Sequence, residues 1–79
     1  MIDLELNGRL VVHSEGEAGP YLMVPLRQLP AVEEVLRSQS IGFSVSRDAI
    51  QVDGHEAVVL IDFGRRADAS RIQTVLDAH

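Results

Sequence analysis

Two short runs without any polar residue constrain this chain more than any other feature. One is Tyr21-Leu22-Met23-Val24, and the other is Ala-Val-Val-Leu-Ile within residues 56–63. A strand with one face in water alternates between apolar and polar residues, whereas an unbroken apolar run is typical of a strand covered on both faces. The sequence therefore predicts two central strands, each covered above and below.

Two further segments have the spacing of amphipathic helices, with apolar residues every three or four positions. Pro30 fits only the first turn of a helix, where backbone N–H groups have no intrahelical acceptor, so the first helix begins near Arg27 or at Pro30 itself. Asp68 is a favourable N-cap for the second helix. The two apolar stripes are Leu26, Leu29, Val32, Val35 and Leu36, and Ala69, Ile72, Val75 and Leu76.

The first residues of the chain predict a hairpin. Residues 2–6 alternate between apolar and polar side chains, and Asn7-Gly8 then favours a two-residue turn. Residues 9–13 should return as the second strand, with Leu10 and Val12 on one face. We therefore expect an N-terminal β-hairpin over residues 1–13.

The segment between the first helix and the second apolar run predicts short strands. Residues 43–46 alternate like a half-buried strand, and Arg47-Asp48 is a plausible tight turn into residues 49–52. Asp53-Gly54 is a second hairpin signal before the apolar run of residues 56–63.

The order hairpin, strand, helix, strands, helix predicts one α+β domain over residues 1–79, with its core in residues 20–79. Because β-α-β crossovers are right-handed in nearly all cases, the two apolar strands can lie adjacent and parallel, with shorter strands outside them. Both helices then cover one face of a mixed sheet.

This order of elements resembles a ferredoxin-like fold with its split β-α-β core, and also small bacterial α+β proteins of unassigned activity. The resemblance covers residues 20–79 and rests on the pattern of elements, so it implies a fold and no particular chemistry. The last strand of that fold is missing after the second helix. The resemblance implies that part of the N-terminal hairpin takes its place at the sheet edge.

Two helices cover only one face of a sheet, so the other face needs a cover of its own. If Leu22 and Val24 point toward the helices, then Tyr21 and Met23 point away from them. Each large apolar side chain left in water forgoes about 1.5 to 3 kcal/mol, which is large beside the stability of a small domain. The cover is the N-terminal hairpin, a second copy of the chain or a different protein, and we expect the second copy, a homodimer.

Composition excludes several classes of function. The sequence has no cysteine, which removes disulfides, thiolate metal sites and cysteine nucleophiles. Its formal net charge of −5 argues against nucleic-acid binding, which needs a cationic surface. With no basic and apolar leader and no run of about 18 apolar residues, we expect a cytoplasmic protein and no membrane interaction.

The best local indication of a site is Gly64-Arg65-Arg66, which follows a central strand and precedes a helix. Open α/β sheets often bind anions at that place, and arginine suits phosphate or carboxylate. Arg65 and Arg66 are therefore candidate residues for a small anion or a protein partner. Two points stand against this reading: Asp68 would occupy the helix cap, and the arginines could instead neutralise Asp62 and Asp68.

Tyr21 and the histidines are weaker candidates. Tyr21 is either a phenol facing a pocket or a packed strand aromatic. His55 follows Asp53-Gly54 in a turn, and its spacing to His13 and His79 matches no metal motif, so we expect neither a metal nor a cofactor. No nucleophile and base can be paired from the sequence.

The sequence thus favours a non-enzymatic interaction or regulatory module that binds a protein partner or a small anionic ligand. A second hypothesis is a small cofactor-independent enzyme, in which a dimer encloses a pocket lined by Tyr21, Met23 and a histidine. A third is an acidic antidote that covers a basic partner surface. Its charged side would consist of Glu5, Glu15, Glu17, Glu33 and Glu34.

Overall fold

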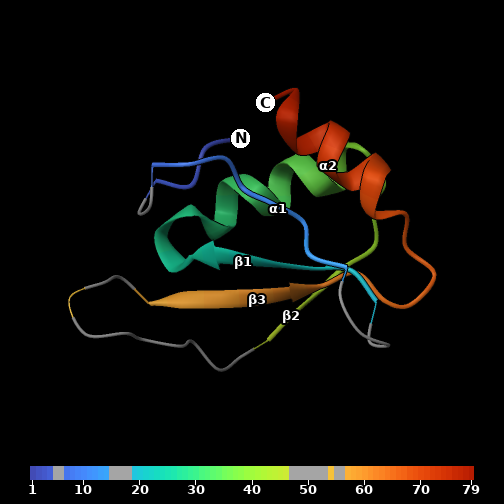
Figure 1. Ribbon diagram of the computed structural model, residues 1–79, viewed down its shortest axis with the longest axis horizontal. Helices are drawn as coiled ribbons and strands as arrows, with labels where there is room; N and C mark the ends of the chain where they lie inside the picture. The colour runs from blue at the N-terminus through green and yellow to red at the C-terminus, as the bar shows by residue number, and fades with distance from the viewer. Residues whose placement is uncertain (5–6, 15–18, 47–53, 55–56) are drawn as a thin grey trace.

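A computed structural model of the chain describes residues 1–4, 7–14, 19–46, 54 and 57–79. It has two α-helices and an antiparallel sheet of three strands, so the predicted α+β class is confirmed. Both helices lie on the same side of the sheet (Figure 1). The elements in chain order are β1 (Tyr21–Pro25), the 3-10 turn η1 (Leu26–Gln28), α1 (Leu29–Ser38), β2 (Ser44–Val45), β3 (Val58–Asp62) and α2 (Ala69–Asp77).

The strand order in the sheet is β1-β3-β2, and both pairings are antiparallel. The two apolar runs are therefore neighbours, as expected, but the predicted mixed sheet with a parallel pair is wrong for the described strands. The reason is that α1 connects β1 to β2, not to β3. Because β1 and β2 are each antiparallel to β3, they run in the same direction, and β3 returns between them.

The face of the sheet toward the helices forms the core. Leu22 lies opposite Ile61 and Val24 opposite Val59, and all four side chains are buried. Leu22 and Val24 therefore belong to the face toward the helices, which is the condition under which Tyr21 and Met23 were expected to point away. Opposite them, the helices bury one side chain in each of two successive turns, namely Val32, Leu36, Ile72 and Leu76.

The helix starts follow the sequence. α1 begins at Leu29, one residue before Pro30, which was the second of the two predicted starts, and η1 is a separate turn before it. Asp68 is the N-cap of α2, where its Oδ1 accepts a hydrogen bond from the Arg71 backbone N–H at 3.1 Å. The predicted cap is therefore confirmed.

The N-terminal segment pairs differently from the predicted hairpin. Ile2 forms an isolated bridge with Arg9, and the Asp3 N–H donates to the Gly8 carbonyl at 2.6 Å. A two-residue turn at Asn7-Gly8 would have paired residue 6 with Arg9 instead. A continuous hairpin over residues 1–13 is not confirmed.

Two glutamine side chains hold this N-terminal segment against the helices. The Gln28 amide accepts from the Leu4 N–H at 3.1 Å and donates to the Ile2 carbonyl. The Gln73 amide bonds in the same way to the backbone of residues 10 and 12. Leu10 is 2% exposed and belongs to the core. The described residues before His13 therefore lie on the helix side of the sheet, as the blue trace in Figure 1 shows.

At the end of this segment the chain reaches the edge of β1. His13 and Tyr21 exchange two backbone hydrogen bonds, each of 2.8 Å. Their rings stack, with centroids 5.2 Å apart and planes inclined by 22°. Since directly opposed residues share a face of a sheet, His13 lies at the edge of the face that points away from the helices.

The outer face of the sheet, which points away from the helices, is apolar at its centre. Met23 lies opposite Leu60, with Val58 further along β3, and these side chains are half-buried. No described residue of the N-terminal segment before His13 covers these side chains. The alternative in which the N-terminal hairpin covers this face is therefore not borne out by the described residues. Residues 47–53, where a further turn and strand were expected, lie outside the described residues.

Candidate functional site

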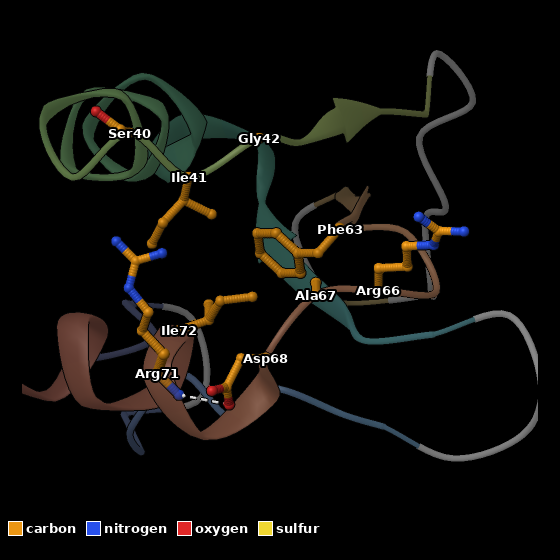
Figure 2. A pocket seen from close by; sticks show the side chains of 9 residues that line it. All are labelled: Ser40, Ile41, Gly42, Phe63, Arg66, Ala67, Asp68, Arg71 and Ile72. Carbon is orange, nitrogen blue, oxygen red and sulfur yellow. Dashed lines mark hydrogen bonds between the residues drawn. The ribbon is translucent and has the colours of Figure 1, made fainter.

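A pocket of about 400 Å³ opens where the C-terminal end of α1, the end of β3 and the first turn of α2 meet. Figure 2 shows the side chains around it. Its apolar lining is Ile41, Phe63, Ala67 and Ile72, and its charged lining is Arg66, Asp68 and Arg71. Ser40 and Gly42 complete it.

The apolar floor is an extension of the core. Ile41 and Phe63 are each 8% exposed and Ile72 is 2% exposed. Phe63 follows β3 and continues its alternation, so it points to the same side as Ile61. In Figure 2 its ring lies between the side chains of Ile41 and Ile72 and that of Arg66.

Two turns bring the loop segments to this floor. After α1, Ser40 adopts φ 56, a left-handed conformation in which glycine is far more usual. This turn lets the Ile41 N–H bond back to the Leu36 carbonyl at 3.0 Å. After β3, the Gly64 N–H bonds to Asp62 Oδ1 at 2.9 Å, and Gly64 itself has φ 84. The chain therefore reverses on both sides of the floor.

Two arginines carry the positive charge of the pocket. Arg71 Nη2 donates to the Gln39 carbonyl, just past the end of α1, at 3.1 Å. Arg66 makes no hydrogen bond or ion pair with any residue of the described ranges. In Figure 2 their guanidinium groups lie on opposite sides of the Phe63 ring. With Asp68, the lining has a formal charge of +1.

The candidate residues from the sequence are spread over the molecule. Arg66 lines the pocket, whereas Arg65, its neighbour in the same exposed turn, does not. Neither pairs with Asp62 or Asp68. Tyr21 lies on the outer face against His13. His55 lies outside the described residues, so its role stays a prediction.

Sequence reasoning missed Arg71 and Phe63. Arg71 lies three residues after the capping Asp68 and just before the core residue Ile72, which places it on the side of α2 nearest the end of α1. The position of Arg71 between the cap and Ile72 can be read from the sequence. Its place in a pocket, however, can be recognised only once the two helices are placed relative to one another. Phe63 was assigned to a central strand, with no sign that a pocket would open above its ring.

Other kinds of site find no support in the described part of the chain. It contains no group of three or more His, Asp or Glu side chains that could hold a metal ion. None of its helices is long and apolar enough to cross a membrane. Comparison with protein-family models, curated proteins and solved structures gave no match. The functional argument therefore rests on the geometry of this chain.

Proposed function

We propose that this chain is a non-enzymatic binding module that holds a small anionic ligand in the pocket between α1 and α2. One observation carries the proposal: Arg66 and Arg71 border a floor made of the buried side chains Ile41, Phe63 and Ile72. An apolar floor with a few polar groups at its border is the usual composition of a small-molecule site. The volume of about 400 Å³ falls within the range of roughly 300 to 1,000 Å³ known for such sites.

The charge of the pocket supports an anion. The whole chain carries a formal charge of −5, but the pocket lining carries two arginines and one aspartate. The Arg66 guanidinium is free of described partners, and Arg71 commits Nη2 to the Gln39 carbonyl. Guanidinium groups bind carboxylates and phosphates through short, charge-assisted hydrogen bonds.

The side chains of the pocket favour binding over catalysis. Ser40 and Asp68 are the oxygen-bearing side chains in its lining, and Asp68 Oδ1 already caps α2. A nucleophile needs a base within hydrogen-bond reach, and the lining offers no histidine. Tyr21 and Met23, which with a histidine would line the pocket of the dimeric enzyme hypothesis, lie on the outer face and do not line this pocket.

Calorimetric titration with carboxylate and phosphate probes tests this function. We expect Arg71→Gln to weaken the binding of the best probe by about tenfold, as loss of a hydrogen bond to a charged group does. Arg65→Gln is the matched control, because Arg65 lies in the same turn as Arg66 but outside the pocket. Equal loss in both variants, or no binding of any anion, would contradict the proposal.

A second candidate role is self-association through the outer face of the sheet. The observation in its favour is that Met23, Val58 and Leu60 are apolar, half-buried and not covered by the described N-terminal residues before His13. A second copy of the chain offers the same apolar face, and two-fold association of identical faces is the commonest form of oligomer. We therefore keep the homodimer as a proposal.

The arrangement of the strands and of α1 also supports a ferredoxin-like fold, which we propose here. In its favour, α1 joins β1 to β2, which run in the same direction with β3 between them, as in a split β-α-β unit. The bridge from His13 to Tyr21 lies at the free edge of β1, where the missing last strand would be. We propose a ferredoxin-like arrangement in which the N-terminal segment supplies that edge.

A further inference from the structure

Asp68 limits what kind of anion the pocket takes. We infer that the ligand is a monocarboxylate attached to a compact apolar group, an inference that rests on the function proposed above. Three features of the pocket carry it: the charge of Asp68, the free donors of Arg71 and the apolar floor.

The first feature weighs against phosphate. Backbone N–H groups at a helix N-terminus commonly bind phosphate. At the start of α2, however, the Asp68 carboxylate occupies this position and accepts a hydrogen bond from the backbone N–H of Arg71 at 3.1 Å. Its negative charge lies within the pocket lining and repels a second, doubly charged anion more than a singly charged one. The formal charge of +1 over the lining matches a single negative charge.

The second feature favours a carboxylate. The Arg71 guanidinium uses Nη2 for the Gln39 carbonyl, and no other hydrogen bond of this group involves a residue of the described ranges. Its remaining N–H groups can bind both oxygens of a carboxylate side by side, which is the geometry this pair prefers. Figure 2 shows the guanidinium next to Ile41, at the border of the floor.

The third feature requires an apolar group on the ligand. Ile41, Phe63 and Ile72 together form a floor without a polar side chain. A small hydrated anion such as acetate would leave this floor in water, whereas an aromatic or branched aliphatic group would cover it. An acid with such a group therefore gains binding affinity both from its contact with the arginine and from covering the floor.

Four probes separate these contributions. Phenylacetate carries both the charge and the ring, acetate lacks the ring, and phenylacetamide lacks the charge. Inorganic phosphate also lacks the ring, so it is compared with acetate to separate phosphate from carboxylate. We expect phenylacetate to bind at least about tenfold more tightly than each of the others. 3-Methylbutanoate distinguishes a branched aliphatic group from an aromatic one, and binding of either acid supports the inference.

Variants of the whole chain test the assigned roles. We expect Arg71→Gln to lose about tenfold in phenylacetate affinity and Arg65→Gln to lose nothing. Asp68→Asn keeps an oxygen to cap α2 and removes the charge, so it should bind phosphate several-fold more tightly than the unchanged chain. Melting curves by circular dichroism confirm that each variant is folded before it is titrated.

The outcomes separate this inference from the proposed function. If phosphate binds as tightly as phenylacetate, and Arg71→Gln weakens both, the ligand class is wrong while the anion pocket stands. If phenylacetamide equals phenylacetate, the charge plays no part and both proposals fail. If no probe binds to the folded chain, both fail as well.

Discussion

Gln73 holds Val12 in the way that a neighbouring strand would: its Oε1 accepts the Val12 N–H at 2.7 Å. The Nε2 of the same amide donates to the Leu10 carbonyl at 2.9 Å. Helix α2 thus supplies through one side chain the paired donor and acceptor that a β-ladder supplies through its backbone. This contact fixes the N-terminal segment on the helix side and leaves the outer face of the sheet to another cover.

Replacing Gln73 tests this contact. Gln73→Leu keeps the size of the side chain but leaves the partly buried Leu10 carbonyl and Val12 N–H without their partner. We expect the free energy of unfolding in urea to fall by about 1 to 3 kcal/mol. Gln39→Leu is the control, because Gln39 is exposed and its side chain makes no hydrogen bond to a described residue. Equal stability of the two variants would contradict the assigned role.

Gly19 lies against the turn after β3 so closely that no side chain fits. A Cβ atom there would lie 2.4 Å from the Gly64 carbonyl oxygen, and Gly19 has φ 89. We expect Gly19→Ala to lose about 2 kcal/mol or more. Gly42→Ala, where a Cβ meets no atom within 4 Å, should stay within about 0.5 kcal/mol of the parent. Urea unfolding compares the two, and a well-tolerated Gly19→Ala would show that the two loops are not in contact.

Ser40 should be a site where glycine stabilises the fold. Its φ of 56 is costly for a residue with a Cβ and free for glycine. We expect Ser40→Gly to raise the free energy of unfolding by about 1 kcal/mol. Ser38→Gly, two residues earlier and at the last position of α1, should lower it by about 0.5 kcal/mol. Thermal melts measure the stability of each variant relative to the parent chain. A change in the same direction for both variants would contradict the left-handed turn at Ser40.

The sequence predicts the local pattern of this fold well. The alternation of Leu22 and Val24 with Tyr21 and Met23, the first-turn position of Pro30 and the Asp68 cap each depend on a few neighbouring residues. Within the N-terminal segment, Leu10 and Val12 lie on one face as expected, and this face packs against the core. Local propensity and periodicity are sufficient for such features.

The errors concern contacts between distant residues. The predicted hairpin turn at Asn7-Gly8 is not confirmed: Ile2 bridges to Arg9, and Gln28, far along the chain, bonds to the backbone at Ile2 and Leu4. The strand after α1 was predicted at residues 43–46, but its place in the sheet was not. The parallel pairing was wrong because β1 and β2 lie on either side of β3, and β3 is antiparallel to both. The pocket requires the end of α1 to lie beside the start of α2, which no local pattern encodes.

From the apolar outer face of the sheet we expect a dimer whose population rises with the concentration of the chain. We expect light scattering over a dilution series to show the mass of two chains at high concentration, and Met23→Asp to remove association while the chain still folds. Leu26→Asp is the control, because Leu26 is 46% exposed but belongs to η1. A parent chain that is monomeric at every concentration would contradict self-association and leave the face to another protein.

The central claim is that a small anion binds above Phe63. A titration of the isotope-labelled chain with phenylacetate, followed by the backbone amide signals in nuclear magnetic resonance, tests it most directly. The account predicts saturable shifts at Phe63, Ala67, Arg71 and Ile72, with none at Met23 or Leu60 on the outer face. Shifts that concentrate on the outer face, or no shift at any concentration, would contradict it.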